Sequence, residues 1–164
     1  MSVVTVKVTD EFINVASDSI LVYEDTKRTD SNFNKLVQVN GITVGSTGSA
    51  QEASLFMKFC EEHDTPEASE KGVLSFLCDF KTWQSKYLEP SNIENEYIIV
   101  IKDKAFVTTG LFVEEVKNYA AIGAGQDFAL AALYLDHSAK EAVKVACDLS
   151  CYVSEPIIEF SIKK

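Results

Sequence analysis

The segment Leu36–Cys60 reads LVQVNGITVGSTGSAQEASLFMKFC and decides the class of fold. Two short β-type runs, LVQV and ITVG, flank Asn40-Gly41, the strongest short-range signal for a two-residue β-hairpin turn. A helix is predicted directly afterwards, because Ser49 can cap it and Glu52, three residues later, can bond back as in a capping box. The apolar face of this helix consists of Leu55, Phe56, Phe59 and Cys60. A hairpin followed by an amphipathic helix indicates an α+β fold.

Alternating apolar and polar residues predict further strands on both sides of this segment. They are expected at Val3–Val8, Phe12–Ser17, Ile20–Tyr23, Tyr97–Ile101, Ala105–Gly110 and Tyr119–Gly123, with a last strand after Pro156. In the first of them, Val4, Val6 and Val8 lie on one face, and Val3, Thr5 and Lys7 on the other. The polar stretch Glu24–Asn34 is expected to be an exposed hairpin loop.

Three more helices are predicted from cap residues and apolar stripes. They begin at Thr65-Pro66, after Gly123-Ala124-Gly125, and at the capping box formed by Ser138 and Glu141. The helix FALAALYL is apolar on nearly every face and is expected to be buried between layers or between subunits. The order of strands, two helices, strands, two helices and one strand lacks regular β–α alternation. It predicts antiparallel sheets with paired helices packed outside them.

Composition restricts the class of protein. The 164 residues are expected to form one domain, 1–164. A net charge of -10 disfavours nucleic acid as a partner, and no apolar run approaches the roughly 20 residues that span a bilayer. The four cysteines include no CxxC pair, which argues against a metal site. Because the first residues, MSVVTVKVTD, do not resemble a signal peptide, a cytoplasmic protein with free thiols is expected. With two histidines, His63 and His137, in polar stretches, the sequence argues against Ser-His-Asp chemistry and most zinc sites.

Two groups of motifs together are distinctive. The first is NKLVQV at 34–39 followed by GSTGSAQ at 45–51, and the second is AIGAG at 121–125, FALAA at 128–132 and DLSCY at 148–152. In order and spacing these motifs resemble the proteasome β-subunit family. The resemblance is strongest to the bacterial branch of that family, the heat-shock-locus V peptidase. The resemblance runs from Ser2 to about Ser154. It implies the N-terminal nucleophile (Ntn) hydrolase fold, a four-layer αββα sandwich of two antiparallel sheets flanked by helix pairs.

The resemblance also implies a set of site residues. Removal of Met1 would expose Ser2 as the nucleophile, with Asp18, Lys35 and Asp148 as charged partners. The family glycine whose N–H helps to form the oxyanion hole matches Gly45, and the substrate-binding segment is Gly45, Ser46 and Thr47. A free α-amino group, whose pKa in unstructured peptides is about 7.7–8.0, would replace histidine as the base.

Each of these residues also has a structural interpretation. Asp18 can cap a turn beside Ser19, and Lys35 can be a charge at a strand edge. Gly45 and Gly48 can serve only the turn into the helix. Asp148 stands four residues after Lys144, which suits a solvated ion pair.

Two functions are therefore expected as alternatives. The first is a peptidase that cleaves polypeptide substrates and works in an oligomer, a hexameric or stacked double ring with an ATPase unfoldase as partner. No cofactor is expected apart from a monovalent cation bound by backbone carbonyls at Cys147, Ser150 and Val153, as the resemblance implies. The second is a catalytically inactive ring or scaffold protein that binds partners, because the family serine in the G-S-G segment is Ala124 here.

Overall fold

The computed structural model describes residues 2–23, 26–28, 33–89 and 92–164. Its strands are β1 (Val4–Val8), β2 (Phe12–Ser17), β3 (Leu21–Tyr23), β4 (Thr26–Arg28), β5 (Leu36–Val39), β6 (Ile42–Thr47), β7 (Glu96–Ile101), β8 (Lys104–Thr109), β9 (Phe112–Glu115), β10 (Tyr119–Ile122) and β11 (Ile158–Lys163). Its helices are α1 (Ala50–Glu62), α2 (Glu70–Gln84), α3 (Gln126–Tyr134) and α4 (Ala139–Leu149).

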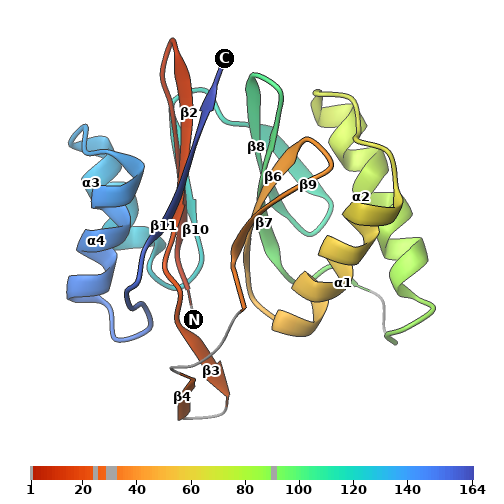
Figure 1. Ribbon diagram of the computed structural model, residues 1–164, viewed down its shortest axis with the longest axis horizontal. Coiled ribbons are helices and arrows are strands. Elements are labelled where there is room, and N and C mark those ends of the chain that lie inside the picture. The colour runs from red at the N-terminus through yellow and green to blue at the C-terminus, as the bar shows by residue number, and fades with distance from the viewer. Residues whose placement is uncertain (1, 24–25, 29–32, 90–91) are drawn as a thin grey trace.

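Two antiparallel sheets face each other between two pairs of helices (Figure 1). One sheet has the order β10-β1-β2-β11 and carries α3 and α4 on its outer face, and the other has the order β5-β6-β7-β8-β9 and carries α1 and α2. The predicted α+β sandwich with four layers is therefore confirmed. A small sheet of β3 and β4 projects from the end at which the chain begins (Figure 1).

The hairpin turn at Asn40-Gly41 is confirmed. Both residues have positive φ, 44° and 78°, which is the backbone conformation of the two-residue turn that suits twisted strands. Val39 pairs with Ile42 directly across this turn, so the turn fixes the register of β5 on β6.

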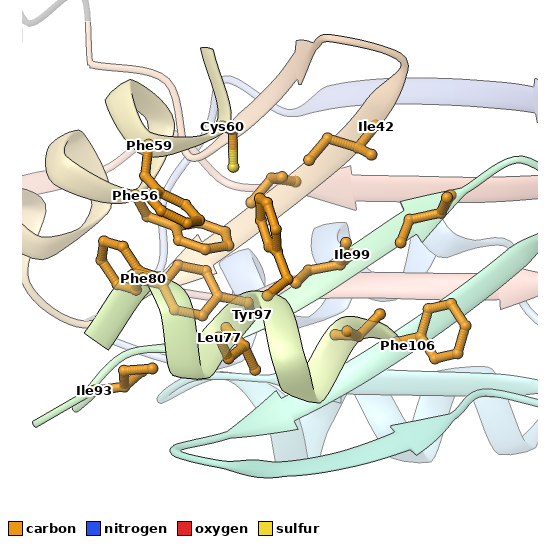
Figure 2. Close-up of a cluster of buried hydrophobic side chains, with 14 of the residues drawn as sticks. Ile42, Phe56, Phe59, Cys60, Leu77, Phe80, Ile93, Tyr97, Ile99 and Phe106 are labelled. Carbon is orange, nitrogen blue, oxygen red and sulfur yellow. The ribbon is translucent and has the colours of Figure 1, made fainter. Parts of the chain in front are cut away.

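Side chains of α1, α2 and the adjacent sheet form an aromatic-rich core (Figure 2). Phe56 lies at its centre, with its ring centroid 4.4 Å from that of Tyr97 and 4.8 Å from that of Phe80. Offset and edge-to-face aromatic pairs of this kind add stabilisation beyond the area that they bury. Of the predicted α1 face, Phe56, Phe59 and Cys60 are buried and Leu55 is half-buried.

The residues of strand β1 divide between its two faces as predicted, and the first three of them are buried whichever face they are on, which alternation alone does not predict. Val4 and Val6 pack into the core between the two sheets, whereas Val3 belongs to the core under α3 and α4. On the same side as Val3, the Thr5 hydroxyl donates to the Ala139 carbonyl oxygen at 2.9 Å. Because β1 is buried in this way, Ser2, two residues before the strand, also lies in the interior of the sandwich.

Two expectations about the helices α1 and α2 are wrong in detail. Helix α2 does not begin at Thr65-Pro66: its N-cap is Ser69, which accepts from the Gly72 N–H at 3.1 Å. The Thr65 hydroxyl instead donates to the Asn40 carbonyl oxygen. Glu52 does not bond back to Ser49, because its carboxylate accepts from the segment before β7. Leu149, the last residue of α4, is 62% exposed.

The expected loop Glu24–Asn34 lies partly outside the described residues, and its described part contains β4. Strand β9 was not predicted either. Among the described residues, no helix is both long and apolar enough to cross a membrane.

Helix α3 is covered on one side only. Ala129, Ala132 and Leu133 are buried, but Tyr134 at its end is 77% exposed and Leu135 is 70% exposed. The all-round apolar character of this helix is therefore not explained by packing within one chain.

Candidate active site

Ser2 is 4% exposed and lies two residues before β1. The Gly125 N–H donates to its carbonyl oxygen at 3.1 Å. A Cβ atom on Gly123 would lie 2.6 Å from that oxygen and 2.8 Å from Cγ2 of Thr47. The glycine-rich end of β10 thus passes so close to the Ser2 backbone that a side chain on Gly123 would not fit.

Asp18 and Lys35 form a buried ion pair beside this residue. Lys35 Nζ donates to both carboxylate oxygens of Asp18, at 2.9 and 2.8 Å, and the two side chains are 4% and 0% exposed. Asp18 also accepts from the backbone N–H of Val3 at 2.9 Å and of Ile20 at 3.2 Å. These bonds compensate the cost of burying the carboxylate, and they tie the start of β1 to the end of β2.

Burial and charge act in opposite directions on Lys35. Desolvation lowers the pKa of its ammonium group below the ordinary value, and the Asp18 carboxylate opposes this by stabilising the cation. The hydrogen bonds to Asp18 hold the Lys35 ammonium group in place. Because burial outweighs the effect of Asp18, Lys35 still loses its proton more readily than a solvated lysine does.

Ser2 and Lys35 line the same cavity, which has a volume of about 370 Å³. Its apolar wall is formed by residues that include Ile20, Leu21, Val22, Phe33 and Ala53, and its polar wall by the segment 46–51 and Asn95. Apart from Lys35, the described lining residues carry no charge. A larger cavity of about 690 Å³ lies between the β5–β6 hairpin and the end of β11, and its described lining includes none of the expected site residues.

The structure does not bring Gly45 to the cavity. Gly45 lies within β6 opposite Leu36 and Ile98, and a Cβ atom on it would be 2.5 Å from Cγ1 of Val4. It is the close approach of β1 that requires glycine here. Gly48 lines the cavity instead, with φ at +120°. Its place directly before the helix cap Ser49 was the available signal in the sequence.

Ser46 and Thr47 lie on the cavity as expected. The Thr47 hydroxyl donates to Oε2 of Glu96 at 3.3 Å, and the same oxygen accepts from the Gly123 N–H at 3.1 Å. Glu96 therefore joins both segments that border Ser2. Neither Glu96 nor Asn95 was singled out from the sequence, because their contacts link strands that are far apart in the chain.

Asp148 is not among the residues that the structure brings together at the cavity. Its side chain is 58% exposed and accepts from Lys144 Nζ at 3.0 Å, which is the solvated pair that the spacing also allows. Exposed pairs of this kind contribute little to stability.

The residues expected to bind a monovalent cation lie at the end of α4. The Ser150 carbonyl already accepts from the Val153 N–H at 3.4 Å, and the Val153 side chain packs towards Gly125. Cys147 is half-buried, and burial, together with the Asp18 charge, raises the pKa of its thiol to about 11. A carbonyl oxygen has two lone pairs, so this hydrogen bond does not occupy the Ser150 oxygen fully, and the cation site stays a prediction.

No protein-family model and no curated protein matches the chain. Solved structures do match it over almost its whole length. BPH of Thiobacillus denitrificans in complex with Epoxomicin has a TM-score of 0.89 at 21% sequence identity, covering 98% of both chains. A second BPH structure has a TM-score of 0.86 at 22% identity, covering 98% of this chain and 97% of BPH.

The chain has the fold of these proteins. Eukaryotic HslV from Trypanosoma brucei also has it, with a TM-score of 0.74 at 18% identity over 99% of both chains. The proteasome-type Ntn-hydrolase fold that the motifs implied is therefore confirmed, and what the site does with that fold is argued from its own geometry.

The close approach of β1 to Gly45 can be tested by substitution. We expect Gly45→Ala to lower the free energy of unfolding by about 1–3 kcal/mol, because the added methyl group overlaps the fully buried Val4 side chain. In a Val4→Ala background the same change should cost less, since the overlapping atom is gone. Urea unfolding of the four proteins measures this coupling. Equal costs in both backgrounds would contradict the steric explanation.

Proposed function

We propose that this chain is a proteasome-type Ntn peptidase of the cytoplasm that hydrolyses peptide bonds through Ser2 after removal of Met1. The observation that supports this most is the buried Asp18–Lys35 pair lining the same cavity as Ser2. Buried charge of this kind is expensive to maintain, and its place beside a hydroxyl suits an activated nucleophile.

The proposed reaction begins with attack of Ser2 Oγ on the substrate carbonyl carbon. The free α-amino group accepts the hydroxyl proton, since no histidine lines the described part of the cavity. Lys35, held by Asp18, stabilises the negative charge that develops on Oγ. The proton passes to the leaving amine as the peptide bond breaks. Water, activated by the α-amine, then hydrolyses the ester on Ser2 and releases the acid product.

The developing oxyanion needs a hydrogen-bond donor on the cavity wall. In the role expected for Gly45 we propose the backbone N–H of Gly48, because Gly48 lines the cavity beside the N-terminus of α1. One such donor contributes about 3 kcal/mol of transition-state stabilisation. The N-terminal end of the helix dipole favours negative charge at the same place.

The lining of the cavity also indicates the class of substrate. Its apolar wall and the absence of an unpaired charge among its described lining residues favour an uncharged, apolar side chain on the acyl side of the scissile bond. A charged side chain would lose its hydration without gaining a partner.

We also propose that the chain works in a ring, hexameric or stacked in two layers, with an ATPase unfoldase as partner. Exposed apolar residues support assembly. They lie on α3 and α4 or within three residues of their C-terminal ends and are 38 to 77% exposed: Phe128, Tyr134, Leu135, Leu149 and Tyr152. We call these residues the α3–α4 face. Apolar faces of this kind are typical of protein–protein contacts, and we propose a second copy of the chain as the occupant.

The nucleophile is tested with epoxomicin and a peptide amide that carries an apolar residue before the scissile bond. We expect intact mass spectrometry to find Ser2 as the first residue and one adduct on Ser2. Ser2→Ala should abolish the adduct and lower kcat/KM by up to about 10⁶-fold.

Ser54→Ala is the matched control, because that hydroxyl donates to the Ala50 carbonyl on the exposed side of α1. It should leave adduct formation and rate unchanged. Retention of Met1 throughout, or full activity of Ser2→Ala, would overturn the proposal. A wild type that assembles but neither forms the adduct nor cleaves the peptide would favour the scaffold function that Ala124 suggests.

The pH dependence of kcat/KM reports the two proposed ionisations. The rate should rise as the α-ammonium loses its proton, around pH 7.7–8.0, and fall as Lys35 loses its own. Because burial lowers the pKa of Lys35 from 10.5, the alkaline fall should come below pH 10.5. In Lys35→Arg the cation persists to higher pH, so any remaining activity should lack that fall. A fall at the same pH in both proteins would contradict the role of Lys35.

Assembly is tested by analytical ultracentrifugation of Tyr134→Glu against Tyr23→Glu. The two tyrosines are 77% and 69% exposed, but only Tyr134 belongs to the α3–α4 face. We expect the wild type and Tyr23→Glu to form rings and Tyr134→Glu to form smaller species. The association constant of Tyr134→Glu should be at least about ten-fold lower, because burying an unpaired charge in the contact costs more than about 1.4 kcal/mol. Monomeric wild type, or equal assembly of both variants, would overturn the assignment of this face.

A further inference from the structure

Asn95 immediately precedes β7, is 1% exposed and lines the cavity of Ser2. Its Oδ1 accepts from the Ser49 N–H at 2.6 Å, and its Nδ2 donates to the Ser49 carbonyl oxygen at 2.8 Å. Both backbone groups of one residue are thus held by one side-chain amide. We call this pair of bonds the Asn95 clamp.

The Asn95 clamp acts on the turn that contains Gly48. A Cβ atom on Gly48 would lie 2.2 Å from Oδ1 and 3.2 Å from Cα of Asn95, and φ of Gly48 is +120°. That conformation is one that residues with a Cβ rarely adopt. Because the Ser49 N–H is already used by Asn95, it is not available to a substrate, and the neighbouring Gly48 N–H is a donor that this turn can offer.

The position of Asn95 is itself fixed by Glu52, which accepts from the Asn95 N–H. This carboxylate is 2% exposed. Its Oε1 accepts from the Asn95 N–H at 3.1 Å and from the Tyr97 hydroxyl at 2.9 Å, and its Oε2 accepts from the Glu94 N–H at 2.9 Å. No ion pair to Glu52 occurs within the described ranges. Three donors and the N-terminal turn of α1 therefore compensate the buried charge.

This arrangement is more elaborate than a helix cap requires. Ser49 already caps α1 by accepting from the Glu52 N–H, so the buried acid and amide are not needed to begin the helix. What they add is a fixed distance between β7, the turn at Gly48 and the first turn of α1. An oxyanion donor must be fixed in this way before the reaction to stabilise the transition state.

We propose that Asn95, held by Glu52, is a positioning residue that orients the Gly48 N–H towards the oxyanion. This inference rests on the proposed function. The inference goes beyond the proposed function because it assigns part of the catalytic rate to Asn95 and Glu52, which do not touch the substrate carbonyl.

The test compares Asn95→Asp with Asn40→Asp. Asn95→Asp preserves the shape and the acceptor but removes the donor to Ser49. Asn40→Asp makes the same change at the opposite end of α1, where Nδ2 donates to the carbonyls of Cys60 and Glu61 at 2.8 and 3.0 Å. We expect Asn95→Asp to lower kcat by about 10²-fold with KM changed less than about three-fold, as for loss of an oxyanion donor. Asn40→Asp should lower stability without lowering kcat.

Urea unfolding of both variants separates stability from rate. If Asn95→Asp lowers kcat no more than Asn40→Asp does, the positioning role is overturned while the proposed function stands. If the wild type itself neither hydrolyses the peptide nor binds epoxomicin, the proposed function fails, and this inference with it.

Glu52→Gln provides a second route should Asn95→Asp not fold. It keeps the volume of the side chain but places an amide where a carboxylate accepted from backbone N–H groups. We expect kcat to fall by about ten-fold, and a Gly48 amide that exchanges its hydrogen faster than in the wild type. Unchanged kcat together with unchanged exchange would overturn the inference.

Discussion

The buried ion pair between Asp18 and Lys35 is the interaction on which the arrangement of the site depends. Asp18 follows β2 in one sheet, and Lys35 precedes β5 in the other. The pair therefore joins the two sheets at the end of the sandwich where Ser2 lies. Its energetic cost is compensated because two backbone N–H groups complete the coordination of the carboxylate. One of these N–H groups belongs to Val3, the residue next to Ser2.

Around this pair, the walls of the cavity are fixed by polar contacts between segments distant in the chain. Glu96 connects Thr47 to Gly123, and Asn95 connects β7 to Ser49. Each contact is made by a side chain at the beginning of β7. The first residues of one central strand thereby control both sides of the cavity in which a substrate would lie.

The sequence was sufficient for the features that depend on local pattern. The hairpin at Asn40-Gly41, the two faces of β1 and the order of elements follow from turn chemistry and periodicity. Asp18 and Lys35 were predicted as site residues through a family resemblance, and in the structure they pair at the cavity that Ser2 also lines. Gly45 and Gly48 could not be distinguished, because the difference depends on which one packs under Val4, a contact between sheets. The start of α2 was misplaced since Thr65 bonds to Asn40, a contact across 25 residues that no local rule contains.

Strand β1 has a further consequence for how the molecule unfolds. Val4 and Val6 of β1 belong to the core between the sheets, and Val3, directly before the strand, belongs to the core under α3 and α4. Strand β7 joins the core between the sheets, through Ile98 and Val100, to the core under α1 and α2, through Ile99 and Ile101. None of the three cores can open without removing a strand from a neighbouring one. The layers are thus expected to be lost in one cooperative step rather than one after another. A protein built in this way keeps Ser2 and the Asp18–Lys35 ion pair in register until the whole domain unfolds, and partly open forms with a loosened cavity are rare.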